Sequence, residues 1–355
     1  MRILHLADIH IDLVATRLGK WKIVNGVNVI YTERLERFRK IIQHGVNLKV
    51  DMIVISGDLF NRSKPFPQEL WDVASILDSI PISIPTFIIP GNHDEKTSRG
   101  CALQPLQDRR PHVRIILEPT IFDINSNPRK HYVFAPWGTS LNELHEIRKK
   151  LIYPEPILIT HLGTTLEGKH WTEIAGEVGN INLSDLKALN FQAVLLGHYH
   201  GQTNLGQNIW YSGSPECYNF GEAEQVKGYL LWDFDEINKT VVAHSWQIQD
   251  GPLFKTFTVE EFLDYKEPGF SGNVKVQGEA TEEQKAVIIE RLQTFQCDDY
   301  KLDLQSTLKV KRTFALKGKS NIEVLTNYLE SKNIGAEAIP GLIELDQDIE
   351  EYVRL

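Results

Sequence analysis

Short apolar runs rich in β-branched residues recur along the first two hundred positions, and polar side chains follow each run at once. Runs of this length that are bounded by turn-forming residues are typical of buried strands. In open α/β sheets ligands bind beyond the carboxyl ends of the strands, so the residues just after these runs are the first candidates for a functional site. The predicted strands cover residues 2–7, 52–56, 86–89, 157–159 and 193–196.

Between these runs, apolar residues recur at the spacing of amphipathic helices. The second helix follows Pro67, a residue favoured at the start of helices, and Ser184 is expected to cap the fourth. An alternation of strands and helices predicts a parallel sheet that carries helices on its faces. The predicted helices cover residues 33–49, 68–79, 141–151 and 184–189.

Three stretches depart from this alternation. Asn25 and Gly26 lie between two β-prone runs, which predicts a hairpin over residues 21–31. Residues 163–182, which include His170, have no clean period, and we expect a loop over the site. Three later runs alternate in the manner of antiparallel strands, and we expect them to form a second sheet. These runs cover residues 208–212, 228–234 and 240–248.

The pattern changes again near Gly251. A strand, a helix that opens on the capping box at residues 281–284, and two further strands predict a small βαββ domain. Its predicted elements cover residues 273–277, 281–295, 301–305 and 307–315, and terminal helices follow at 322–332 and 342–355. We therefore expect domains over residues 1–250 and 251–316 and a helical segment over residues 317–355.

Composition narrows the classes of protein. Hydrophobic residues make up 42% of the chain and charged residues 24%, as in soluble globular proteins. No apolar run approaches the ~20 residues that span a bilayer. Three widely separated cysteines favour neither a disulfide framework nor a zinc ribbon, so we expect a cytoplasmic protein. The net charge of −9 argues against a generic nucleic-acid coat, although bound metal ions can supply positive charge locally.

The polar residues after the five strands have the chemistry of metal ligands. Read alone, the stretch at residues 91–94 is equally typical of a polar turn, but the same arrangement recurs at every strand end. No thiolate takes part, which disfavours a structural zinc site. Carboxylate, amide and imidazole ligands together suit Mn²⁺ or Fe²⁺, with Zn²⁺ or Mg²⁺ as alternatives. The candidates are Asp8, His10, Asp58, Asn92, His93, Asp94, His161, His198 and His200.

In this order, the motifs resemble those of the calcineurin-like metallophosphoesterases. The set is Asp-x-His, Gly-Asp, Gly-Asn-His-Asp, a lone His and Gly-His-x-His, all between residues 8 and 200. Within that superfamily the chain is similar to the SbcD-type nucleases of bacterial double-strand-break repair, on residues 2–10, 57–60, 91–94 and 211–215. The resemblance implies a four-layer α/β/β/α sandwich, followed by a βαββ domain that caps DNA and by C-terminal helices.

The resemblance also implies a role for each candidate. Two divalent ions, with Mn²⁺ favoured, would share Asp58 as a bridging carboxylate. The first ion would be completed by Asp8, His10 and His200, and the second by Asn92, His161 and His198. His93 would stabilise a phosphoryl oxygen or protonate the leaving oxygen, and Asp94 would orient it. The alternative for His93 is a further metal ligand.

The activity implied is that of a DNA exonuclease and endonuclease acting at DNA ends or hairpins. The implied assembly is a homodimer within a heterotetramer with an SbcC-like SMC-family ATPase, which residues 317–355 are expected to bind. A phosphoesterase of small nucleotide phosphodiesters and a non-catalytic scaffold are the alternatives. The capping segment argues against the first and the complete ligand set against the second. One departure is Asn61, where several relatives carry a second active-site histidine.

Overall fold

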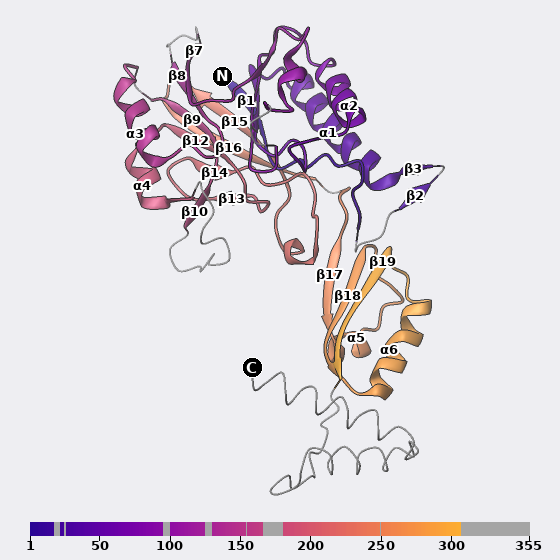
Figure 1. Cartoon of the computed structure of the whole chain (residues 1–355). Coiled ribbons are helices and arrows are strands. Elements are labelled where there is room, and N and C mark those ends of the chain that lie inside the picture. Colours follow the sequence, from indigo (N-terminus) through magenta and orange to yellow (C-terminus); the bar gives the residue numbers. More distant parts are fainter. Residues whose placement is uncertain are drawn as a thin grey trace, which may run out of the picture.

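Two six-stranded sheets pack face to face, and helices cover the outer face of each (Figure 1). The computed structural model describes residues 1–17, 22–24, 26–94, 100–124, 130–153, 155–165, 180–248 and 250–306. Among the helices of these residues, none is both long and apolar enough to cross a membrane. The predicted four-layer α/β/β/α sandwich is confirmed.

The first sheet begins as the parallel sheet that the sequence predicts. Its strands lie in the order β16-β15-β1-β4-β5-β6, and neighbours from β1 to β6 are parallel. The strands are β1 (Arg2–Leu6), β4 (Met52–Ser56), β5 (Thr86–Ile89), β6 (Val113–Ile115), β15 (Gly228–Asp235) and β16 (Thr240–Gln247). Its outer face packs on α1 (Val29–Asn47), α2 (Pro67–Leu77) and the short helix η1 (Gln104–Gln107).

The second sheet has the order β13-β14-β12-β9-β8-β7, and α3 (Leu141–Lys150) and α4 (Leu183–Ala188) cover its outer face. Its strands are β7 (Thr120–Ile124), β8 (Lys130–Ala135), β9 (Ile157–His161), β12 (Ala193–Gly197), β13 (Thr203–Asn204) and β14 (Ile209–Tyr211). The parallel pair β10 (Gly163–Thr165) and β11 (Asn180–Asn182) precedes α4. His170 lies outside the described residues.

The prediction that three later strands form one sheet is wrong. β14 joins the second sheet, whereas β15 and β16 extend the first, with β15 antiparallel to β1. Alternation of polar and apolar residues shows which face of a strand is buried, but it carries no information about the neighbouring strand. β15 is nevertheless buried along most of its length, because Leu230, Trp232 and Phe234 lie between the two sheets while Tyr229 and Leu231 lie in the core under the helices of the first sheet.

Of three local details, the hairpin agrees with the sequence pattern and the starts of two helices differ from it. The predicted hairpin is confirmed, since β2 (Ile23–Val24) pairs antiparallel with β3 (Val27–Asn28). Helix α1 starts four residues earlier than expected, because the side chain of Asn28 accepts a hydrogen bond from the amide of Ile30 at 3.2 Å. The N-cap of α4 is Asn182, so Ser184 lies inside that helix and does not cap it.

Residues 254–306 form a separate three-stranded parallel sheet with its own apolar core (Figure 1). The order of elements is β17 (Phe254–Thr258), α5 (Val259–Asp264), β18 (Asn273–Ala280), α6 (Glu282–Thr294) and β19 (Asp299–Ser306). The βαββ pattern expected from the sequence therefore omitted β17 and α5. The capping box of Thr258 and Glu261 was a sequence signal for α5. The predicted strand at 307–315, the terminal helices and the segment 317–355 lie outside the described residues.

Candidate metal centre

The carboxyl ends of five strands meet at one end of the sandwich, which we call the ligand rim. β1, β4 and β5 bring their ends from the first sheet, and β9 and β12 bring theirs from the second. A contact between backbone and side chain joins the two sheets there, since the amide of His198 donates to both carboxylate oxygens of Asp8 at 3.0 and 3.1 Å. The structure thus brings together all seven predicted metal ligands, which are Asp8, His10, Asp58, Asn92, His161, His198 and His200.

The ligand atoms fall into two groups around Asp58. On one side, His10 Nε2 lies 3.6 Å from Asp58 Oδ2 and 3.1 Å from His200 Nε2. On the other side, His161 Nε2 lies 3.6 Å from the same carboxylate oxygen and 3.1 Å from Asn92 Oδ1. A shared carboxylate between two sets of donors is the arrangement that two-metal sites require.

The protonation of His161 fits a bound cation. His161 Nδ1 lies 2.7 Å from the carbonyl oxygen of Ser56, which only accepts, so the ring proton is on Nδ1 and the Nε2 lone pair faces Asp58. A lone pair aimed at a carboxylate is repulsive unless a cation lies between them. Burial lowers the pKa of His161 to about 3, so the ring stays neutral and able to bind a metal.

The two buried carboxylates lead to the same conclusion. Burial is the largest influence on both and raises the pKa of Asp8 to about 7 and that of Asp58 to about 6. Burial of an ionised carboxylate without a counter-charge is unfavourable. A divalent cation would supply that charge, so the donor set of the rim fits bound metal ions.

The rim also concentrates backbone strain. Asp8, His10, Asp58 and His198 have positive φ angles of 53°, 49°, 52° and 108°. Non-glycine residues adopt such angles at a cost on the order of 1–3 kcal/mol each, and they cluster at functional sites. The fold therefore holds these four side chains in directions that relaxed strands would not give them.

Two glycines make room for the ligands. A Cβ atom on Gly57, whose φ is 91°, would lie 2.2 Å from His161 Nδ1. A Cβ atom on Gly91 would lie 2.1 Å from Asp58 Oδ1. The glycine before Asp58 and the glycine before Asn92 are thus steric requirements of the site, and the motifs Gly-Asp and Gly-Asn-His-Asp already contained that signal.

The prediction that Asp94 orients His93 is wrong. Asp94 is fully buried, and its Oδ2 accepts the amides of Leu59 at 2.7 Å and Phe60 at 3.2 Å. Its Oδ1 accepts the amide of Gly91 at 2.7 Å. The bonds from Leu59 and Phe60 join the chain after β4 to the chain after β5, and the bond from Gly91 closes the turn after β5. Asp94 therefore fixes the backbone around Asp58 rather than the imidazole.

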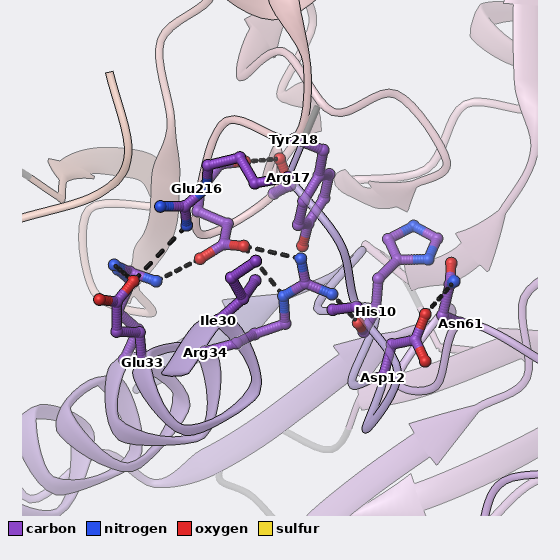
Figure 2. Close-up of polar contacts among 12 residues, drawn as sticks. His10, Asp12, Arg17, Ile30, Glu33, Arg34, Asn61, Glu216 and Tyr218 are labelled. Carbon is purple, nitrogen blue, oxygen red and sulfur yellow. Dashed lines mark hydrogen bonds and ion pairs between the residues drawn. The ribbon is translucent and has the colours of Figure 1, made fainter. Parts of the chain in front are cut away.

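His93 itself is exposed at the rim and has a different partner. Its Nδ1 lies 3.1 Å from the carbonyl oxygen of Asn61, and its ring stands edge-on to that of His10 with centroids 4.7 Å apart. The side chain of Asn61 is engaged elsewhere, donating to Asp12 Oδ2 at 2.8 Å (Figure 2). Asn61 therefore meets His93 through its backbone, and the role of His93 in the reaction stays a prediction.

Sequence reasoning missed the residues behind His200. Glu222 Oε1 lies 2.9 Å from His200 Nδ1, which leaves Nε2 for a metal. Lys227 donates to Glu222 Oε2 at 2.7 Å and to the carbonyl oxygen of His200 at 3.0 Å. Burial alone would raise the pKa of Glu222, but His200 and Lys227 outweigh it and lower the pKa to about 2. No motif marks Glu222, because it lies 22 residues from His200 in the chain.

The sequence matches the family described as calcineurin-like phosphoesterase over residues 1–202. Two curated relatives are both named as the SbcD subunit of the nuclease SbcCD. The protein of Staphylococcus epidermidis is 27% identical over 68% of this chain and 69% of its own length. The protein of Staphylococcus saprophyticus is 26% identical over 65% of each. The chain thus spans about two thirds of the length of these relatives.

Two solved structures are similar over part of the chain. The protein TT1561 of Thermus thermophilus is 15% identical with a TM-score of 0.40, covering 69% of this chain and 98% of that protein. A dimetal phosphatase from Danio rerio is 13% identical with a TM-score of 0.41, covering 66% of this chain and 93% of that protein.

Proposed function

Because the chain belongs to the calcineurin-like phosphoesterase family, we propose that it is a metal-dependent DNA nuclease that hydrolyses phosphodiester bonds at DNA ends or hairpins. The observation that carries the proposal is the complete set of seven donors, made of Asp58 and the six side chains around it. The two relatives named as SbcCD nuclease subunits support DNA as the substrate. We further propose Asp8, His10, Asp58, Asn92, His161, His198 and His200 as the ligands of two divalent ions.

Asp58, Asp94 and His93 would have different roles in the reaction. Two bound cations would supply an activated water and neutralise charge on the phosphate. Asp58 would hold both ligand groups at a fixed separation, since Asp94 and the amide of His93, which donates to Asp58 Oδ1 at 2.9 Å, fix its surroundings. His93 Nδ1 donates to the carbonyl oxygen of Asn61, so a second proton carried on Nε2 would be the one that His93 donates to a phosphoryl or leaving oxygen.

We also propose the setting in which this nuclease works. Mn²⁺ is the favoured ion, because the ligands combine carboxylate, amide and imidazole. By analogy with the relatives' name, the chain would be the nuclease subunit of an SbcCD-type complex with an SbcC-like SMC-family ATPase, acting in DNA repair, recombination or replication in the cytoplasm. The active assembly would contain two copies of the chain.

The alternative is a phosphoesterase of small nucleotide phosphodiesters, which the net charge of −9 favours, because duplex DNA is itself strongly negative. End-labelled duplex, a hairpin and bis(p-nitrophenyl) phosphate, each incubated with Mn²⁺ and with or without the ATPase, distinguish the two. We expect shortening of the duplex and opening of the hairpin, with both activities lost in Asp58→Asn. Hydrolysis of the small diester while both DNA substrates stay intact would contradict the nuclease assignment.

A further inference from the structure

We propose that Arg34, Glu216 and Tyr218 are positioning residues that hold the loop Asp8-Ile9-His10 in its strained conformation and thereby set the affinity of the first metal site (Figure 2). No motif of the sequence points to these residues, and none of them is a metal ligand. The inference rests on the proposed two-metal function and deepens it, because it assigns the support of one of the two sites.

The network is built on a buried carboxylate. Glu216, whose exposed fraction is 2%, accepts a hydrogen bond from Arg34 Nε at 2.9 Å and pairs with Arg37 as well. Arg34 and Arg37 lie one turn apart on α1, so both guanidinium groups reach the same carboxylate. Burying two arginines and a glutamate gives little net stability, since desolvation offsets their attraction. The main effect of the network is therefore to fix the position of Arg34 next to the ligand loop.

The network ends on three consecutive carbonyl oxygens of the ligand loop. The hydroxyl of Tyr218 shares its single proton between the carbonyl oxygens of Asp8 at 2.7 Å and Ile9 at 2.9 Å in a bifurcated hydrogen bond. Arg34 Nη1 donates to the carbonyl oxygen of His10, and Figure 2 shows its guanidinium between His10 and Glu216. The guanidinium carbon also lies 4.6 Å from the centroid of the Tyr218 ring, so the two donors brace each other.

These hydrogen bonds stabilise the strained backbone of the loop Asp8-Ile9-His10. Asp8 and His10 have φ angles of 53° and 49°, and the loop is almost completely buried, so its carbonyl groups must find partners within the protein. The amides of Ile9 and His10 are already fixed on the carbonyl oxygen of Asp58 at 2.9 and 3.0 Å. Because its amides are held on one side and its carbonyls on the other, the loop backbone fixes the direction in which the Cα–Cβ bonds of Asp8 and His10 leave the chain.

The aromatic ring of Tyr218 adds a second restraint. It stands edge-on to His10 with centroids 5.4 Å apart and to His200 with centroids 5.2 Å apart. Tyr218 therefore contacts two ligands of the first site while it holds the backbone of the third, Asp8. Within the described part of the chain, Arg34, Glu216 and Tyr218 form no hydrogen bond, ion pair or ring contact with a ligand that belongs to the second site alone.

The test is a titration of the full chain with Mn²⁺, followed by calorimetry and by electron paramagnetic resonance. We expect the wild type to bind two Mn²⁺ and to show the signal of a spin-coupled pair. In Tyr218→Phe, one equivalent should bind about tenfold more weakly, as is usual when an outer-shell partner is removed, and a single-ion signal should persist to higher Mn²⁺. The matched control is Tyr31→Phe, which removes a buried hydroxyl that donates to Asp72 at 2.6 Å from the same helix as Arg34.

A second variant keeps the test decisive if the first perturbs the fold. Arg34→Lys retains a charge for Glu216 but lacks the fork that reaches the carbonyl oxygen of His10 at the same time, so it should weaken the same single site. Unchanged binding of both equivalents, or equal weakening of both, in either folded variant would overturn the proposal. Fewer than two Mn²⁺ bound by the wild type would instead overturn the proposed two-metal function, and this inference with it.

Discussion

The ligand rim and the three-stranded sheet at residues 254–306 are stabilised in different ways. The rim contains four non-glycine residues with positive φ and several buried polar groups, among them Asp8, Asp58 and Asp94. Within residues 254–306, all of which are described, only glycines have positive φ, and an apolar core with capping boxes at Thr258 and Thr281 holds the elements together. Of these two regions, the rim, where the ligands converge, contains the non-glycine strain and the buried carboxylates, whereas the three-stranded sheet is stabilised by ordinary apolar packing.

The sharpest way to separate the two regions is Asp58→Asn. The amide should be tolerated by the fold, because burial already raises the pKa of the carboxyl to about 6 and disfavours its charge. We expect loss of both metals and a phosphodiesterase rate lower by about 10³-fold or more, as several kcal/mol of metal assistance disappear. Metal analysis and thermal unfolding check this. Asp264→Asn, on the exposed side of α5, is the matched control and should change neither.

His93→Leu tests function within the rim without removing a ligand. If His93 acts on the reacting phosphate, the rate should fall about 10²- to 10⁴-fold while two Mn²⁺ remain bound. His145→Leu, at an exposed position of α3, should leave the rate unchanged. Loss of one Mn²⁺ in His93→Leu would show that the imidazole is a metal ligand. Such a role is geometrically possible, because one ring nitrogen of His93 lies within 4.8 Å of ligand atoms of His10 and Asp58.

Phe262→Ala tests the three-stranded sheet at residues 254–306. Phe262 is fully buried and packs against Phe257 and Phe295 with ring centroids 5.6 and 5.3 Å away. We expect the three-stranded sheet to lose about 3–5 kcal/mol while Mn²⁺ binding at the rim is retained. Hydrogen exchange followed by mass spectrometry measures both regions in one experiment, with Glu260→Ala as the exposed control on the same helix. Loss of Mn²⁺ binding would mean that the rim depends on this sheet.

The smallest expected effect is a selective response to acid. Burial lowers the pKa of His5 on β1 to about 3 from 6.5, so below pH 6.5 the unfolded chain binds a proton that the folded chain excludes. Stability of the sandwich should therefore fall as the pH drops from about 6.5 toward 3, whereas residues 254–306 contain no histidine. Hydrogen exchange of metal-free protein at pH 7 and pH 5 should show faster opening around β1 than around β18. In His5→Gln this difference should shrink, and its persistence would assign the acid response to other groups.

Much of the fold was visible in the chain itself. The strands before each ligand, the hairpin at residues 21–31 and the parallel start of the first sheet follow from short apolar runs, turn residues and helical spacing. The grouping of the later strands did not, since β14 and β15 alternate alike yet join different sheets. The sequence prediction missed β17 and α5, which follow the turn residues Gly251 and Pro252, although the sequence contains the capping residues of α5.

The sequence by itself determined which atoms are offered to a metal and at which strand ends they lie, because residue type and strand position are local properties. Only the tertiary structure decided what each polar residue does. Asp94 accepts hydrogen bonds from backbone amides, Asn61 contacts His93 through its carbonyl oxygen, and Glu222 orients His200. These contacts join residues 22 to 35 positions apart, and the bond from Tyr218 to Asp8 spans 210. Hydrogen-bond partners at such separations depend on where the packed sheets place them, which no pattern along the chain encodes.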